Sequence, residues 1–145
     1  MTKKISLLAV SACAIVAAGA GAATIKLAPS AGPFTGTTSQ HHPLSFTVAP
    51  TRNRIPGEKT KLEFKCPDGS AGGFTVSHGV PVRVRNGAFS GTVKGSSSKG
   101  HPYTMHLVGR FSSRTRASGT ISLTITYPDS GACTSGVVSW SAKHR

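Results

Sequence analysis

The stretch "GTISLTITY", residues 119–127, alternates from Thr120 onward between hydroxyl-bearing and apolar side chains. Successive side chains of a β-strand point to opposite faces, so this alternation predicts a strand with one buried face and one face in water. The inward residues of this strand are Ile121, Leu123, Ile125 and Tyr127. One buried face per strand is typical of antiparallel sheets, so we expect an antiparallel partner on each side.

The same period of two recurs in both directions along the chain. The other segments that show it are residues 42–49, 60–66, 81–93, 103–111 and 136–143. Asn86-Gly87 lies within 81–93, and such a pair between two alternating runs is typical of a tight hairpin. Gly, Pro and Ser clusters separate the segments, and no segment has a helical repeat longer than one turn. The pattern predicts an all-β protein, either an antiparallel β-sandwich of about seven short strands or a small barrel.

The N-terminus has the three parts of a secretory signal peptide at residues 1–23. Two lysines come first, an uncharged apolar run follows, and small residues close the segment, with cleavage expected after Ala22 or Ala23. We therefore expect a secreted protein without a transmembrane segment. The spelling "VSAC" at 10–13 leaves open a lipoprotein anchored through Cys13.

The rest of the chain divides by composition into two parts. Residues 24–40 are small, polar and rich in Pro and Gly, which predicts a flexible N-terminal arm. Residues 41–145 contain all the alternating segments and are of a length that suits one domain. The expected organisation is therefore a signal peptide, a flexible arm and a single β domain.

Cys66 and Cys133 are the cysteines that remain after the leader. Export favours a disulfide between them, and their spacing fits neither a Cys-x-x-Cys metal motif nor a thiol with a neighbouring base. This bond would tie an early strand to the last one and close a loop of about 68 residues. We expect Trp140 to pack on the disulfide. The predicted core consists of Phe46, Phe64, Leu107, Ile121, Leu123, Ile125 and Trp140.

Charge is the strongest compositional feature. Without residues 1–23, 15 basic residues face 4 acidic ones. Such a surface attracts polyanions, which for an exported protein include wall polymers and acidic glycans. Aromatic residues do not alternate with the basic ones, so we expect no sequence-specific nucleic-acid binding. A basic surface that serves solubility alone remains the alternative. The candidate anion-binding residues, on outward strand positions and hairpin tips, are Arg83, Arg85, Arg110, Arg114 and Arg116.

Catalytic chemistry has little support in the sequence. Each of the four carboxylates has a structural explanation. Glu58 follows a Pro-Gly turn, Glu63 lies outward between two lysines, and Asp68 and Asp129 lie in Pro-Asp turns. The six histidines are scattered except for one adjacent pair, so we expect no metal site and no cofactor. Residues 96–99 spell Ser-x-x-Lys, but they lie in a Gly-flanked loop and not at a helix start. We expect a protein that is not an enzyme.

The C-terminal run 109–145, with "FKC" (64–66) and "NGAFSG" (86–91) before it, resembles small secreted β-proteins of high-GC Gram-positive (actinobacterial) bacteria. Those proteins share a Cys-x-x-Gly-x-x-x-Trp-x-Ala-basic ending. The matching residues here are Cys133, Gly136, Trp140, Ala142 and Lys143. The resemblance covers most of residues 42–145. It implies export, a β fold and the disulfide, and it carries over no catalytic residue.

Three functions are compatible with these features. The leading expectation is a secreted binding module for anionic envelope or extracellular polymers. The second is a structural or protein-interaction domain that docks through a sheet edge. The third is a hydrolase that no motif reveals. Ligand identity and oligomeric state do not follow from any of them.

Overall fold

The structure is a computed structural model of the 145-residue chain, and it describes residues 27–145. All regular elements in this range are β-strands, and every ladder between them is antiparallel. The strands are β1 (Gly32–Thr38), β2 (Pro43–Val48), β3 (Arg54–Ile55), β4 (Glu58–Lys65), β5 (Ala71–Val76), β6 (Val82–Arg83), β7 (Ala88–Ser96), β8 (Pro102–Ser113), β9 (Arg116–Tyr127), β10 (Gly131–Thr134) and β11 (Val138–His144). The predicted all-β antiparallel fold is confirmed, with more strands than the seven expected.

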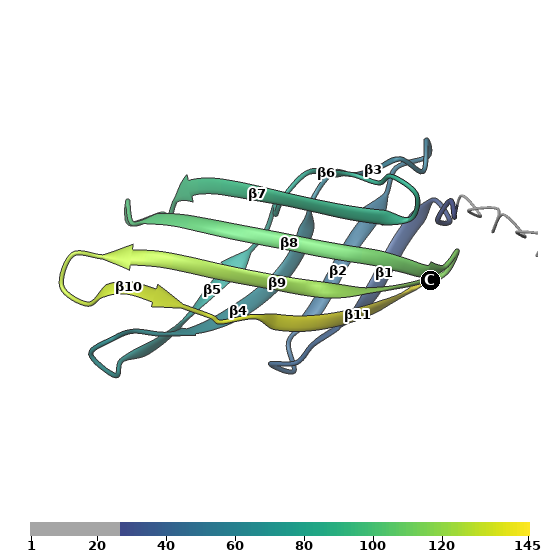
Figure 1. The fold of residues 1–145 in the computed structure, drawn as a ribbon. Helices are drawn as coiled ribbons and strands as arrows, with labels where there is room; N and C mark the ends of the chain where they lie inside the picture. The colour runs from purple at the N-terminus through teal and green to yellow at the C-terminus, as the bar shows by residue number, and fades with distance from the viewer. Residues whose placement is uncertain (1–26) are drawn as a thin grey trace, which may run out of the picture.

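Six of the strands close into a hydrogen-bonded circuit in the order β4, β2, β1, β11, β9 and β10. β5 extends this barrel from β4, and β8 followed by β7 extends it from β9. Figure 1 shows the resulting layers, with β7, β8, β9 and β11 running across the front and β1, β2, β4 and β5 crossing behind them. β3 and β6 form a separate two-stranded ribbon.

β9 holds the circuit together because it is long enough to pair with two successive strands on one side. Its N-terminal half pairs with β11 and its C-terminal half pairs with β10. Between these two strands the chain turns at Ser135, whose hydroxyl accepts a hydrogen bond from the Leu123 N–H at 2.9 Å. β10 pairs with β9 on one side and meets β4 at its end, which closes the barrel.

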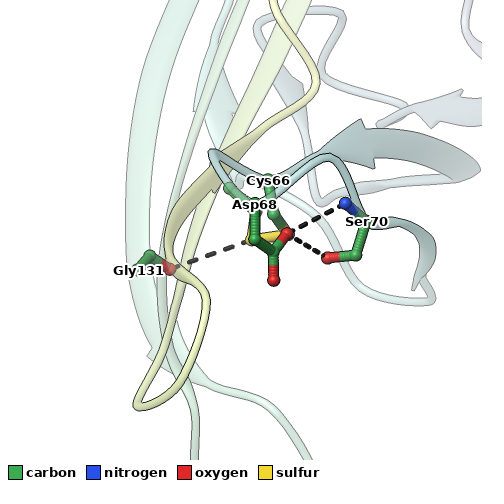
Figure 2. The surroundings of a disulfide bond; sticks show 5 residues. Cys66, Asp68, Ser70 and Gly131 are labelled. Atoms are coloured by element: carbon green, nitrogen blue, oxygen red, sulfur yellow. Dashed lines mark hydrogen bonds between the residues drawn. A yellow bond between two sulfur atoms is a disulfide. The ribbon is translucent and has the colours of Figure 1, made fainter.

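Little backbone pairing closes the barrel at β10, because the ladder between β10 and β4 has the single register pair Thr134↔Lys65. The predicted disulfide is present at this seam, where it joins Cys66, directly after β4, to Cys133 in β10. Figure 2 shows the bond beside the 66–70 turn, in which the Asp68 carboxylate accepts hydrogen bonds from the backbone N–H and the hydroxyl of Ser70. The covalent bond supplements a ladder that is otherwise one residue pair long.

The core lies between the two layers and contains all the residues expected there, each at most 6% exposed. Trp140 is buried as predicted, but its expected packing on the disulfide is wrong. Its ring neighbours are Phe46 and Phe89, with centroids 5.9 and 6.0 Å away. Trp140 pairs with Gly119 and Cys133 pairs with Ile125, and six residues along β9 separate these positions by about 20 Å.

The predicted flexible arm at residues 24–40 is wrong for the part that the structure describes. β1 occupies residues 32–38 and is paired on both sides, with β2 and with β11. Phe34 and Thr38 are buried, and Gly36 lies between them on the same face. Gly36 lies so close to the backbone of Ser141 that a side chain would overlap it. Close packing therefore requires a small residue here. Because small residues are also typical of linkers, the composition did not indicate a strand.

The Asn86-Gly87 turn is confirmed. Asn86 and Gly87 have φ angles of 50° and 73°, which is the left-handed pair that a tight hairpin turn requires. Arg85 and Ala88 exchange backbone hydrogen bonds of 2.8 and 2.9 Å across it.

The signal peptide, its cleavage position and Cys13 lie outside the described residues. No helix in residues 27–145 is long and apolar enough to cross a membrane.

Candidate functional site

Arginines gather where the β3–β6 ribbon approaches β7 and β8. Arg54 and Arg83 are direct cross-strand partners in the ribbon, and both are exposed. The alternate residues, Ile55 and Val82, are buried in the core, so burial of these apolar side chains sets which way the arginines face. Like charges directly opposite each other are unfavourable in a β-ladder. The fold therefore places two positive charges opposite each other, and their repulsion lowers its stability.

The hairpin turn brings more positive charge to the same place. Arg85 is bridged to Ala88 across the Asn86-Gly87 turn, and Ala88 is the β7 partner of Arg110 in β8. A surface hollow of about 530 Å³ lies here, and its lining includes Arg83, Arg85 and Arg110. We call this site the arginine hollow. Segments far apart in the sequence thus bring together three of the five predicted anion-binding residues.

Among the residues that the structure describes, no carboxylate pairs with these arginines. The contact between a basic and an acidic side chain that is found within residues 27–145 joins His42 to Glu63, with 2.9 Å between Nε2 and Oε1. In the same range, the guanidinium groups of Arg83, Arg85 and Arg110 make no ion pair and no hydrogen bond. A guanidinium offers five donors in a planar fork that fits phosphate, sulfate or carboxylate oxygens. The arginine hollow can therefore bind an anion without first breaking internal contacts.

Arg114 and Arg116 lie elsewhere, at the turn between β8 and β9. The carbonyl of Arg114 accepts a hydrogen bond from the Ser30 N–H at 2.8 Å. Arg116 pairs with Ser113 in β8 and with Lys143 in β11, so it belongs to a second basic group at the end of the sheet. Ser118, which lines the arginine hollow, is two residues or about 7 Å from Arg116 along β9. Neither Arg114 nor Arg116 lines the hollow itself.

Glu58 is not the turn residue that the sequence suggested. It is the first residue of β4, its side chain points into the barrel, and it is 1% exposed. Oε1 accepts a hydrogen bond from the Val80 N–H at 3.2 Å, whereas Oε2 has no partner within the described residues. Burial raises the pKa of this carboxyl to about 7. The alternation of residues 60–66, continued back by two positions, would have placed Glu58 on the inward face.

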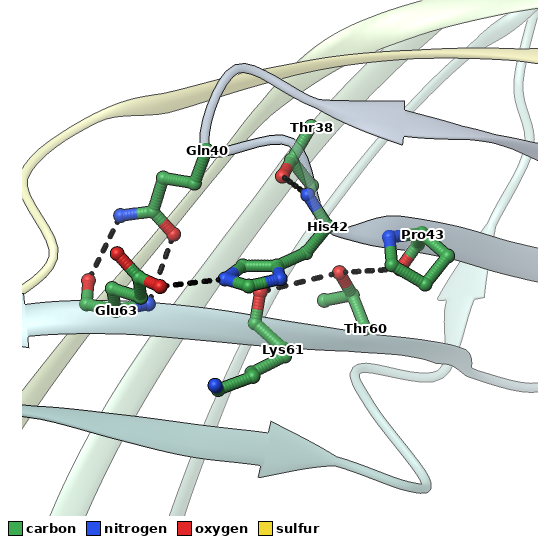
Figure 3. Close-up of polar contacts among 7 residues, drawn as sticks. All are labelled: Thr38, Gln40, His42, Pro43, Thr60, Lys61 and Glu63. Carbon is green, nitrogen blue, oxygen red and sulfur yellow. Dashed lines mark hydrogen bonds and ion pairs between the residues drawn. The ribbon is translucent and has the colours of Figure 1, made fainter.

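Glu63 is exposed, as expected, but its side chain does not pair with the neighbouring lysines. Figure 3 shows the group that it forms with Gln40 and His42. The Gln40 side chain donates to the Glu63 carbonyl and accepts from the Glu63 N–H, both at 2.9 Å. The hydroxyl of Thr60 donates to the Pro43 carbonyl at 3.0 Å. The β2–β4 ladder has only two register pairs, and these side chains continue the connection beyond it.

The other titratable groups are dispersed. The Ser70 hydroxyl and then the Ser70 N–H, both donating to Asp68, hold the pKa of that carboxyl below its usual value. Residues 96–99, with the Ser-x-x-Lys spelling, end β7 and enter the β7–β8 turn. Within residues 27–145, no three His, Cys, Asp or Glu side chains form a group that could hold a metal ion. The arginine hollow is thus the described site where the predicted functional residues converge.

No family model, curated protein or solved structure matches this chain, so functional inference depends on its own residues.

Proposed function

We propose that this chain is an exported, non-catalytic module that binds anionic wall polymers or acidic glycans through the arginine hollow. The observation that carries the proposal is the convergence of Arg83, Arg85 and Arg110 on one hollow, with no carboxylate partner in the described part of the chain. Bound phosphate, sulfate or carboxylate groups would offset the repulsion between Arg54 and Arg83. Anion binding would thus relieve the like-charge repulsion that is present in the unbound protein.

Net charge alone would produce a different kind of binding. A strongly basic protein attracts any polyanion at low ionic strength, whatever the positions of its charges. At about 0.15 M salt the Debye length is about 8 Å, so diffuse attraction weakens while close guanidinium contacts persist. Binding that survives at this salt concentration and depends on the position of the charges is the property that defines a site.

The test compares two triple variants with the same loss of charge. The first is R83Q/R85Q/R110Q, and the control is K59Q/K61Q/K65Q, which changes three exposed lysines of β4. Affinity for inorganic polyphosphate and for polygalacturonate is measured at about 0.15 M salt. We expect the arginine variant to bind at least about tenfold more weakly than the control, because each lost charge-assisted hydrogen bond is worth about 1.5–3 kcal/mol. Equal losses in the two variants would show that only net charge matters.

A third variant separates charge from geometry. R83K/R85K/R110K keeps all three charges but replaces the planar guanidinium forks with ammonium groups. If the hollow recognises oxyanions by paired hydrogen bonds, this variant binds more weakly than the unchanged protein at the same net charge. Unchanged affinity would show that the hollow attracts anions only through its local positive charge.

The second candidate function is docking through the edge of β7. This strand has nine residues and pairs on one side with β8, with no partner strand on its other side among residues 27–145. An added strand would use that free edge. Lys94 lies toward the C-terminal end of this edge and, as a charged residue, opposes such pairing. Lys94→Val would strengthen partner or self-association if docking occurs there, which sedimentation analysis measures.

A further inference from the structure

A second hollow, of about 520 Å³, opens at the other end of β8 and β9, between β5 and the β7–β8 turn. In Figure 1 this region lies toward the left end of the front layer. Aromatic rings from both layers line it, together with hydroxyl, imidazole and ammonium groups from the turn. We call it the aromatic hollow. Its lining includes Phe74, Ser96, Ser97, Ser98, Lys99, His101, Tyr103 and Tyr127.

The inward alternation of β8 and β9 places the aromatic rings there. Tyr103 continues the inward side of β8 and Tyr127 the inward side of β9, and both are partly buried. Phe74 in β5 approaches Tyr103 from the other layer, with ring centroids 4.9 Å apart. His101 lies beside Tyr127, with ring centroids 4.5 Å apart. These rings occupy the place where the packed aliphatic core ends and the barrel meets solvent.

The polar side of the aromatic hollow is held in place by the β7–β8 turn. The Ser97 N–H donates to the His101 carbonyl at 2.8 Å, and the Ser97 hydroxyl accepts from the His101 N–H at 3.1 Å. Ser98 and Lys99, at the tip of the turn, are exposed. The hydroxyls of Tyr103 and Tyr127 make no hydrogen bond within residues 27–145. Donors and acceptors without internal partners therefore surround half-buried aromatic faces.

From this arrangement we infer that the aromatic hollow binds the pyranose ring of a saccharide. A pyranose has apolar C–H faces and an equatorial rim of hydroxyl groups. Aromatic rings contact the faces, while tyrosine hydroxyls, serines and His101 exchange hydrogen bonds with the rim. Small-ligand sites combine apolar and aromatic walls with convergent polar groups, and their volumes are about 300–1,000 Å³. The aromatic hollow falls in this size range, and its lining is about half polar, which suits a ligand with both apolar faces and hydroxyl groups. It lies between two extensions of the barrel, β5 on one side and β8 with β7 on the other.

The disulfide stabilises the same end of the molecule. Cys133 is the β10 partner of Ile125, which also lines the aromatic hollow. Its bond to Cys66 fixes β10 against the end of β4, close to where β5 begins. A preformed hollow loses less conformational entropy when a ligand binds. The covalent closure of the barrel thus also holds the walls of the proposed sugar site.

This inference goes beyond the proposed function and can fail independently of it. Arg110 and Tyr103 are seven residues apart on β8, a distance of about 24 Å along the strand. A variant that alters one hollow therefore leaves the residues of the other unchanged. Sugar binding and anion binding can be measured as separate properties of the same folded protein.

The experiment is a titration of the full secreted chain with two probes, an N-acetylglucosamine trisaccharide and a galacturonate trisaccharide. Binding is measured by calorimetry and by saturation-transfer NMR. We expect binding that Tyr103→Phe weakens about 3–10-fold through loss of one hydrogen bond. Tyr103→Leu, which removes the stacking ring but keeps an apolar side chain, should weaken it further. R83Q/R85Q/R110Q should bind the neutral trisaccharide as the unchanged protein does.

The fluorescence of Trp140 reports whether each variant is folded, because this buried residue lies at the other end of the core. Failure of both trisaccharides to bind the unchanged protein would overturn the inference. Unaltered binding by folded Tyr103→Leu would overturn it as well. If only the galacturonate probe binds and R83Q/R85Q/R110Q abolishes that binding, the ligand is held by the arginine hollow, and the sugar site is again ruled out.

Discussion

Glu58 places a carboxyl group inside the barrel with one hydrogen bond and 1% exposure. Desolvation favours its neutral form, which is why its pKa rises from 4.5 to about 7. No substrate can reach a side chain so deeply covered, so its consequence lies in stability and not in catalysis. Glu58 also connects β4 to the loop before β6, because it accepts the Val80 N–H.

The first prediction is that Glu58 makes the protein less stable as the pH rises. Below pH 4.5 the carboxyl is protonated in both states, so it carries no penalty. Between pH 4.5 and about 7 the unfolded chain ionises while the folded protein keeps its proton, and stability falls. Above that range the loss is complete, at about 3 kcal/mol. Urea unfolding of Glu58→Gln should show a gain over the unchanged protein that grows through this window and then levels off.

The exposed carboxyl of Asp129 provides the control. Asp129→Asn removes a carboxyl that is not buried, so its stability difference from the unchanged protein should not grow between pH 4.5 and about 7 as that of Glu58→Gln does. A stability difference for Glu58→Gln that is equally flat would show that this carboxyl ionises normally in the folded protein.

Arg83 illustrates a residue whose charge is unfavourable for stability at the site proposed to bind anions. The second prediction is that Arg83→Glu raises the free energy of unfolding by a few tenths of a kcal/mol at low salt. The change converts a like-charge cross-strand pair with Arg54 into an opposite-charge pair. The gain should shrink at high salt, as expected for exposed charges. The same variant should lose affinity for polyphosphate; a variant that is destabilised at low salt would contradict the assigned register.

At the scale of elements, the β8–β9 ladder contains a facing pair of glycines. Gly109 and Gly119 are cross-strand partners, and a Cβ on either would meet the ring of Trp140 at 2.7–2.8 Å. A Cβ on Gly119 would also overlap the backbone carbonyl of Val108. The missing side chains create the space into which the Trp140 ring packs. The aromatic core therefore depends on two residues that have no side chain.

The third prediction concerns this contact. Gly119→Ala should destabilise the protein by about 1–3 kcal/mol, because neither the Val108 carbonyl nor Trp140 can move without disturbing the core. Gly73→Ala in β5 is the control, since its one close contact would be with the flexible end of Lys61, and the Leu62 carbonyl lies at an ordinary 3.9 Å. Thermal unfolding of both variants gives the comparison. Equal effects would show that β8 and β9 lie farther apart than the structure has them.

The fourth prediction concerns the seam between β10 and β4. Replacing Cys66 and Cys133 together by Ala should cost about 4 kcal/mol on the chain-entropy account of a loop of this length. Because one register pair remains to hold the seam, amide exchange should accelerate first at Thr134 and Lys65. The β8–β9 ladder should keep its protection in the same protein. Uniform acceleration across all strands would contradict local opening at this seam.

At the scale of the whole molecule, the basic residues outnumber the acidic ones on a small surface. Such a charge excess destabilises the compact state by self-repulsion. One of the four carboxylates, Glu58, lies in the core, so it offsets little of the surface charge. The excess of positive over negative charge on the outer surface is therefore even larger than the composition suggests.

The fifth prediction is that screening and ligand binding both raise the melting temperature. Added sodium chloride should raise it gradually, because it weakens the self-repulsion. Polyphosphate should raise it at concentrations too low to change the ionic strength, because a ligand that binds only the folded state stabilises it by mass action. In R83Q/R85Q/R110Q the response to polyphosphate should shrink while the response to salt persists. A melting temperature that falls with added salt would contradict the prediction.

Much of this architecture follows from local pattern. The alternation in residues 119–127 determined which side chains of β9 face the core, and the Asn86-Gly87 pair determined a turn that requires positive φ at both positions. An export-type leader with two remaining cysteines led to the Cys66–Cys133 bond. The strand face and the turn depend on a residue and its near neighbours, and the disulfide had a single possible pairing outside the leader, so the sequence by itself was sufficient.

The remaining features depend on contacts between segments far apart in the chain. β1 has a linker-like composition, and only its close approach to β11 explains why Gly36 and its small neighbours form a strand there. Glu58 acquires its raised pKa from the surrounding core, and Trp140 packs beside Gly119 because of the β9–β11 register. The arginine hollow and the aromatic hollow each combine at least three strands or turns. Burial, register and charge proximity are properties of the assembled barrel, so only the tertiary structure decided them.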